Sequence, residues 1–376
     1  MRAMFAPVSV PANSKSAEKS HGGSAVALPV KGGKMQREYL EYAKKHLLRL
    51  LAIPSPSCYA KEVLDYIAAE LELMGYTPER TAKDHVLVFL GGDGPGVLLV
   101  AHCDTLGGMV QEVKENGRLR VWPLGLLSPN NAEGENVTII TRSGCRYSGT
   151  FQLNEPSYHV NGTYEAETRT FNNMEIVIDE LTQSKAETLA LGIQTGDILA
   201  FDPRSVITES GFIKSRHLDD KLSAAILLTY AKLLSESNHS PSHKVYLMFT
   251  GFEETSHGGS ANCPVDVRDV IAVDMGCVGK GSECDETMVS IAAANSFSPS
   301  SHSLVSDLIS AGERANAAYS VDVYPYYQSD ADAVIKAGHD VRHCSIGAGV
   351  YASHGYERSH IKGLENTFDL ITAYLE

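Results

Sequence analysis

The stretch that decides the fold is Gly96-Val97-Leu98-Leu99-Val100-Ala101-His102-Cys103-Asp104. Its apolar run, Val97 to Ala101, contains no polar residue. A strand with one face in water alternates apolar and polar residues, whereas a strand buried on both faces does not. The run therefore predicts a central strand of a sheet covered by helices on both sides, with His102 at its carboxyl end.

Helices and strands of the same kind are expected on either side of this run. Apolar residues recur at helical spacing over 36–53, 61–74, 222–234, 303–315 and 363–375. Strand-like apolar runs occupy 85–90, 244–249, 270–274 and 342–346. We expect a three-layer α/β/α domain built from residues 35–110 and 206–376.

The segment between these two pieces has a different texture. Short alternating stretches are separated by Gly, Asn and Ser, and 185–191 is the one convincing helix. Such a pattern is typical of a small all-β unit. Residues 111–205 are therefore predicted to form an inserted β-rich domain of barrel type.

Composition excludes several classes of function. The formal net charge is -14, from 46 acidic and 32 basic residues, which argues against non-specific binding of nucleic acid. Seven cysteines, an odd number without a CxxC pair, indicate reduced thiols rather than a disulfide framework. No apolar run reaches the roughly 18 residues of a membrane span. We expect a cytoplasmic protein whose residues 1–34 form a disordered tail, or precede a natural start near Met35.

Four clusters of His, Asp and Glu lie at or near the ends of the expected strands and helices. They are His102-Cys103-Asp104, His217-Leu218-Asp219-Asp220, Glu253-Glu254 after Phe249-Thr250-Gly251-Phe252, and Asp274 after Ile271-Ala272-Val273. Each cluster alone has an ordinary explanation; the aspartate pair, for example, could simply cap a helix. In open α/β sheets, however, ligands bind at the carboxyl ends of the strands. The four together predict a site there.

The order of these clusters, followed by a histidine near the C-terminus, resembles the co-catalytic zinc peptidases. Within them the chain is most similar to the tetrahedral aminopeptidases, the glutamyl and deblocking aminopeptidases. The stretches that carry this resemblance are 102–110, 218–221, 249–254 and Ser329-Asp330-Ala331. It runs from about Met35 to the C-terminus and includes the insert, where that family carries its oligomerisation domain.

The resemblance implies a metal-dependent aminopeptidase that cleaves the N-terminal bond of short peptides. Two divalent ions, zinc or alternatively cobalt or manganese, are implied to be held by His102, Asp219, Glu254, Asp274 and His354. Asp219 would bridge the ions and Asp104 would orient His102. Glu253 would be the general base. The resemblance also implies a homo-oligomer, with a dodecamer as the family's assembly.

Two alternatives stay open on the sequence alone. His360 competes with His354 for the role of the late ligand, and His354 is favoured because its distance to the final helix fits better. The chain could also be a carboxypeptidase or N-acyl-amino-acid deacylase on the same scaffold, with Arg358 clamping a carboxylate. A non-catalytic oligomeric binding protein on this fold is the alternative from a different class.

Overall fold

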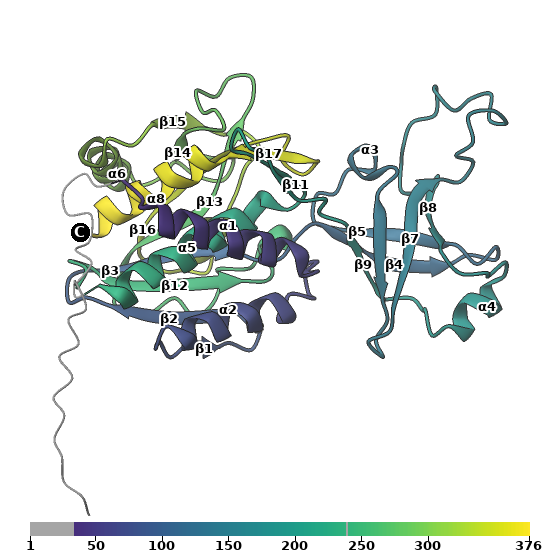
Figure 1. Cartoon of the computed structure of the whole chain (residues 1–376), viewed down its shortest axis with the longest axis horizontal. Coiled ribbons are helices and arrows are strands. Elements are labelled where there is room, and N and C mark those ends of the chain that lie inside the picture. Colours follow the sequence, from purple (N-terminus) through teal and green to yellow (C-terminus); the bar gives the residue numbers. More distant parts are fainter. Residues whose placement is uncertain (1–33, 238–239) are drawn as a thin grey trace, which may run out of the picture.

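The computed structural model describes residues 34–237 and 240–376, which form two bodies joined side by side (Figure 1). The larger body carries a sheet with helices, and the smaller body is a β-barrel inserted between its two sequence pieces. The expected tail at 1–34 lies outside the described residues except for Lys34. In the described part of the chain, no helix is long and apolar enough to cross a membrane.

The larger body contains an 11-stranded sheet. Its strands are β1 (Glu79–Arg80), β2 (Val86–Gly91), β3 (Gly96–His102), β10 (Val206–Ile207), β11 (Phe212–Ser215), β12 (Lys244–Thr250), β13 (Val267–Val278), β14 (Val289–Ala294), β15 (Tyr319–Val323), β16 (Arg342–Tyr351) and β17 (Glu357–His360). They follow the order β1-β2-β12-β3-β13-β16-β17-β11-β10, with β14 joining β16 to β15. The central strands β12, β3, β13 and β16 are parallel, so their carboxyl ends share one edge.

Helices cover both faces of this sheet, as the apolar run at 96–101 predicts. They are α1 (Arg37–Ala52), α2 (Lys61–Leu73), α5 (Leu218–Glu236), α6 (His302–Ala315), α7 (Asp330–Lys336) and α8 (Ile361–Leu375). Val97 and Leu99 of β3 pack in the core beneath α1, α5 and α8, whereas Leu98 and Val100 pack in a separate core with Val334 of α7. Successive side chains of β3 therefore pack into the cores on opposite faces of the sheet. The expected α/β fold class is confirmed.

The smaller body is a closed barrel of six strands in the order β4-β5-β8-β7-β6-β9. Its strands are β4 (Gly107–Val113), β5 (Leu119–Leu124), β6 (Asn136–Ile140), β7 (Arg146–Leu153), β8 (Met174–Ile178) and β9 (Ile198–Phe201), with helices α3 (Pro129–Ala132) and α4 (Lys185–Ala190) beside them. Leu119, Phe151 and Ile176 fill its interior. The insert is expected at 111–205, but its first strand, β4, begins at Gly107. The other strands of the barrel lie within the expected range.

Candidate active site

The pairing of the parallel strands brings three of the four site segments level with one another, those of His102, of Glu253 and Glu254, and of Asp274. His102 at the end of β3 pairs with Thr250 at the end of β12, directly before the turn that carries Glu253 and Glu254. On the other side β13 pairs Ala272 with Val100, so that two residues further on Asp274 lies level with His102. Strand register alone therefore brings together residues as far apart in the chain as His102 and Asp274.

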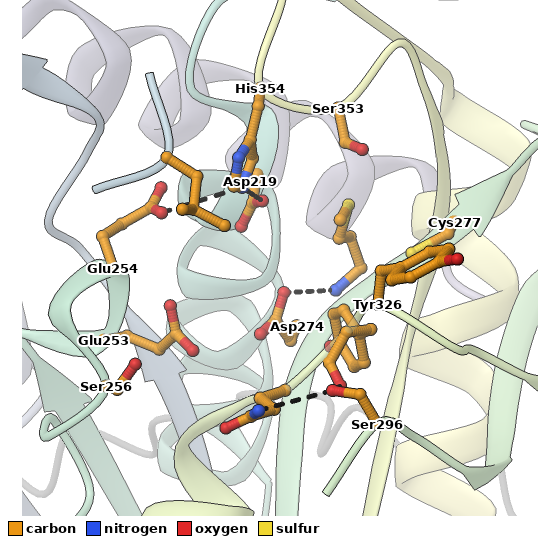
Figure 2. Close-up of a pocket in the computed structure, with 14 residues that line it drawn as sticks. Asp219, Glu253, Glu254, Ser256, Asp274, Cys277, Ser296, Tyr326, Ser353 and His354 are labelled. Carbon is orange, nitrogen blue, oxygen red and sulfur yellow. Dashed lines mark hydrogen bonds and ion pairs between the residues drawn. The ribbon is translucent and has the colours of Figure 1, made fainter. Parts of the chain in front are cut away.

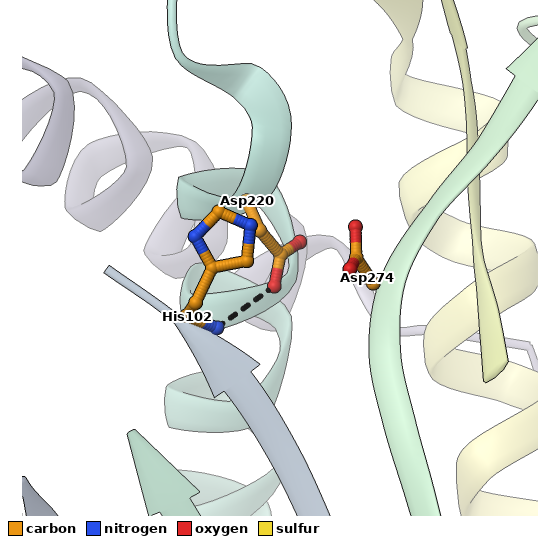
Figure 3. Close-up of side chains that lie close together, drawn as sticks. All are labelled: His102, Asp220 and Asp274. Carbon is orange, nitrogen blue, oxygen red and sulfur yellow. Dashed lines mark hydrogen bonds between the residues drawn. The ribbon is translucent and has the colours of Figure 1, made fainter. Parts of the chain in front are cut away.

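His102 is held at the centre of this group from two sides. Its Nδ1 lies 3.0 Å from the backbone oxygen of Asp104, and its Nε2 lies 2.9 Å from Oδ1 of Asp219. Its backbone N–H donates to Oδ2 of Asp220 at 3.1 Å (Figure 3). The ring is thus fixed with one nitrogen turned to the other site residues, which is how protein frameworks orient an imidazole ligand.

Asp104 contacts His102 chiefly through its carbonyl oxygen, and its carboxylate holds the glutamate turn. The carboxylate accepts the backbone N–H of Glu253 at 3.0 Å and that of Glu254 at 3.3 Å, while Oδ1 lies 3.6 Å from His102 Nδ1. Ser57 donates a further hydrogen bond to it at 2.6 Å. One buried aspartate therefore positions both the histidine and the two glutamates.

His354, rather than His360, lies at the site. Its Nε2 is 3.4 Å from Oδ2 of Asp219 and 3.7 Å from Oε2 of Glu254. His360 instead caps α8, with Nδ1 accepting the N–H of Lys362, and its Nε2 lies 2.9 Å from the oxygen of Ser210.

Glu357, which has no role in the sequence-based site, holds two of the expected ligands in place. Its Oε1 accepts the N–H of His354 at 3.0 Å and its Oε2 accepts that of Asp219 at 3.1 Å. His354 has a φ of 62°, in the left-handed region that costs energy for a residue with a side chain. The bond to Glu357 offsets part of that cost and fixes where the imidazole points.

Asp274 is fixed by its own surroundings. Its Oδ1 accepts the N–H of Met275 at 2.7 Å and its Oδ2 accepts the hydroxyl of Ser329 at 2.6 Å. Ser329 precedes α7, whose first residue, Asp330, accepts the N–H of Gly259 at 2.6 Å. The Ser329-Asp330 pair therefore links Asp274 to the loop that follows the glutamates.

The carboxylates of the site are buried together without a lysine or arginine partner. In the described part of the chain, the ion pairs of Asp219, Glu253 and Glu254 are formed with His102 and His354. Burial, followed by the charge of Asp219, raises the pKa of Asp274 to about 7. Burial likewise raises the pKa of Glu253 well above its usual value. Burial lowers the pKa of His354, but the hydrogen bond that its ring donates to Asp219 and the charge of Glu254 outweigh it and raise the value to about 10.

These donors fit a divalent metal centre. Ligand atoms of His102, Asp219 and Glu254 lie within 4.8 Å of one another, and so do those of His102, Asp220 and Asp274 (Figure 3). Imidazole nitrogen and carboxylate oxygen are the donors that zinc takes besides thiolate. Clustered buried carboxylates are costly unless a cation is bound among them, so the site as built favours metal binding.

A cavity of about 380 Å³ opens onto this cluster. Figure 2 shows carboxylates from three segments and one imidazole facing it, namely Asp219, Glu253, Glu254, Asp274 and His354. Leu126, from the chain that follows β5 of the barrel, also lines it. The cavity is therefore shaped by both bodies and offers room for a small substrate beside the expected ligands.

Comparison with known proteins gives a consistent result. A family described as M42 glutamyl aminopeptidase matches residues 85–370. YhfE of Bacillus subtilis, named as an aminopeptidase, is 39% identical over 329 residues, covering 87% of this chain and 95% of YhfE. The glutamyl aminopeptidase of Lactococcus lactis is 26% identical over 191 residues, covering 50% of this chain and 53% of its own length.

Solved structures support the same fold. The TET1 peptidase of Pyrococcus horikoshii, described as assembling into a tetrahedron or a large octahedral shell, superposes with a TM-score of 0.79 at 21% identity. The match covers 89% of this chain and 99% of that one. The family match and the sequence relatives, rather than the likeness in fold, confirm the expected peptide hydrolase over the binding-protein alternative. The chain belongs to the M42 glutamyl aminopeptidase family and is a metal-dependent aminopeptidase.

Proposed function

We propose that this aminopeptidase works with two divalent ions, zinc in the first place, held by His102, Asp219, Glu254, Asp274 and His354. The observation that carries this proposal is that Asp219, Glu254, Asp274 and His354 line one cavity, with no lysine or arginine paired with them in the described residues. His102 joins them through two groups whose ligand atoms lie within 4.8 Å of one another, one with Asp219 and Glu254 and one with Asp220 and Asp274. Asp219 contacts both His102 and His354, which supports the proposal that it serves both ions. When bound, the ions would lower the pKa of a water molecule and polarise the scissile carbonyl group.

Glu253 is the residue we propose as general base. Its Oε2 lies 3.7 Å from His102 Nε2, and its backbone is fixed by Asp104. A carboxyl whose pKa is raised by burial can both take a proton from the attacking water and give it to the leaving amine. Asp104 does not face the cavity and acts by holding Glu253 and His102.

The lining of the cavity bears on the substrate. Besides the expected ligands and Glu253, it consists of Leu126, Ser256, Met275, Cys277, Ser296, Tyr326, Tyr327, Gln328 and Ser353. Among these described residues there is no lysine or arginine that could pair with an acidic N-terminal side chain of the substrate. There is also no carboxylate besides the expected ligands and Glu253 that could pair with a basic one. We therefore propose that peptides with an uncharged N-terminal residue are better substrates than those beginning with Glu or Lys.

The barrel is proposed to mediate assembly into a homo-oligomer. Several large apolar side chains of the insert stand in solvent, among them Trp122 at 57% exposure and Leu181, which is fully exposed. Exposed apolar side chains of this size often mark protein contacts. Light scattering should give a particle well above the 40.6 kDa of one chain, and a monomer at micromolar concentration would contradict the assignment.

Metal removal and substrate choice together test the proposed chemistry. Prolonged chelation should abolish cleavage of leucine p-nitroanilide, and zinc, cobalt or manganese should restore it, because N and O donors suit all three ions. The same protein should leave N-acetyl-leucine intact. Activity that survives complete removal of metal would overturn the two-ion site, and rapid deacylation would favour the deacylase alternative.

A further inference from the structure

Tyr327 lies at the cavity and is held rigidly there. It is 7% exposed and lines the cavity beside the expected ligands. Its carbonyl oxygen accepts the N–H of Ser296 at 3.0 Å and the hydroxyl of Ser296 at 2.8 Å. Its ring packs edge-on against that of Tyr324, with the centroids 5.5 Å apart. Backbone and ring therefore fix where the phenol points.

The hydroxyl of Tyr327 is buried and has no hydrogen-bond partner. Its neighbours are already engaged, since Asp274 accepts from Met275 and Ser329, and the hydroxyl of Tyr324 bonds with Ser290. Leaving a buried hydroxyl unpaired costs about 1–3 kcal/mol. Because Tyr327 lines the cavity, a partner that arrives with the substrate could offset this cost.

The other groups in the cavity indicate which substrate atom this is. The carboxylates of the cluster accept hydrogen bonds and have no proton to donate when ionised. The carbonyl oxygen of the scissile bond needs donors instead, and its need grows as it gains negative charge. A tyrosine hydroxyl keeps its proton at neutral pH, since its ordinary pKa is about 10.

We propose that the hydroxyl of Tyr327 donates a hydrogen bond to the carbonyl oxygen of the scissile peptide bond and stabilises the negative charge that develops on it. Tyr327 is then a catalytic residue beyond the metal ligands and the general base. The hydroxyl keeps its own proton throughout, so no bond to Tyr327 forms or breaks. The inference rests on the proposed aminopeptidase chemistry of this cavity.

The test compares Tyr327→Phe with Tyr42→Phe. Both changes remove a buried hydroxyl that lacks a hydrogen-bond partner, but Tyr42 lies on α1, away from the cavity. Tyr327→Phe should lower kcat by about 10²-fold with little change in KM, as for the loss of one donor to an oxyanion. Its metal content and melting temperature should match those of the wild type, because the lost hydroxyl had no partner. Tyr42→Phe should leave kcat and metal content unchanged.

Binding gives a second readout that needs no turnover. A phosphonate analogue of leucine, which carries charged oxygens at the reacting centre, should bind Tyr327→Phe about 10²-fold more weakly in calorimetry, whereas free leucine should bind equally well. Unchanged kcat and phosphonate affinity would overturn the proposal. A rise in KM alone, lost metal or an unfolded variant would also overturn it, by showing a ground-state or structural contact instead. A wild type that binds no metal or cleaves no peptide would instead defeat the proposed function itself.

Discussion

The barrel and the active site treat buried carboxylates in opposite ways. Glu175 of the barrel is 1% exposed and forms ion pairs with both Lys114 and Arg118. At the active site, Asp274 is buried next to Asp219 without any such partner among the described residues, and its pKa is raised to about 7. The negative charge of Glu175 is neutralised by basic side chains of the folded chain, whereas the carboxylates of the active site have no lysine or arginine partner among the described residues.

The presence or absence of a basic partner distinguishes a buried carboxylate with a structural role from one suited to bind a metal ion. An ion pair closed within the fold needs nothing further, and its loss affects stability alone. Unpaired carboxylates held close together store repulsion that a bound divalent ion removes, so the energy of metal binding becomes energy of folding. Loss of the Glu175 ion pairs should therefore alter stability without altering catalysis, whereas changes at the cavity should alter metal binding and catalysis.

Glu175→Gln gives the largest expected change in stability. Removing one partner of a buried ion pair costs about 3 kcal/mol here, at the lower end of the usual range because Lys114 and Arg118 reach solvent. Urea unfolding should show this loss while metal content and kcat stay at wild-type values. Glu180→Gln, at an exposed position nearby, is the matched control and should change neither. Loss of metal in Glu175→Gln would break the separation between the two regions.

Zinc should stabilise the protein more strongly as pH rises. Burial raises the pKa of Asp274 to about 7 and that of Glu357 to about 8. Since both folded-state values exceed those of the unfolded chain, the contribution of these two carboxyls to metal-free stability is greatest below about pH 4 and is lost as pH rises through 7 and 8. Zinc at 100 times its Kd adds about 2.7 kcal/mol per ion.

The measurement for this effect is the melting temperature with and without zinc at several pH values. The difference between the two curves should widen from pH 6 to pH 8, because the metal binds deprotonated ligands. A difference that narrows over this range would show that the buried carboxylates are not where the metal binds.

Glu357→Gln should have the smallest of these effects and sharpen the comparison within the active site. It keeps the size of the side chain but weakens the two hydrogen bonds that hold Asp219 and His354. Residues that support metal ligands usually contribute 10–100-fold in affinity. Competition with a zinc chelator should show a loss of about that size, with the fold intact. Glu286→Gln, at a half-buried glutamate paired with Arg358, is the control, and equal zinc affinity in both variants would contradict the role of Glu357.

Much of the fold follows from local sequence pattern. The uninterrupted run at 96–101 forms β3 in the middle of the sheet, and the expected helices before and after it become α1, α2, α5, α6 and α8. The short elements β14, β15 and α7 were not foreseen, since they are stabilised by neighbours distant in sequence rather than by a pattern of their own. β4 starts with Gly107-Gly108, which resembles a turn in the sequence, and it becomes a strand only by pairing with β5 and β9.

His102, Asp274 and the two glutamates meet because the sheet register aligns the strands that precede or carry them, but the supports of the site could not be found from sequence. Glu357 and Tyr327 matter through burial and through the hydrogen bonds they make or lack, and neither property appears in a residue string. The choice between His354 and His360 depends on β17, which pairs with β11 and turns His360 away from the cavity. The order of chemistry-bearing residues was readable from the sequence, whereas the contacts that tune them depend on tertiary packing.

Glu253 and Glu254 provide the most direct test, because adjacent residues are assigned different roles. Glu253→Gln should bind two metal ions and fold normally, while its kcat falls by about 10²–10⁴, the usual contribution of a positioned general base. Glu254→Gln should lose one of the two ions, since an amide is a poor substitute for an anionic ligand. Elemental analysis beside steady-state kinetics measures both. If Glu253→Gln loses metal while Glu254→Gln keeps it, the roles are reversed; if neither variant changes metal content or rate, the proposed site is wrong.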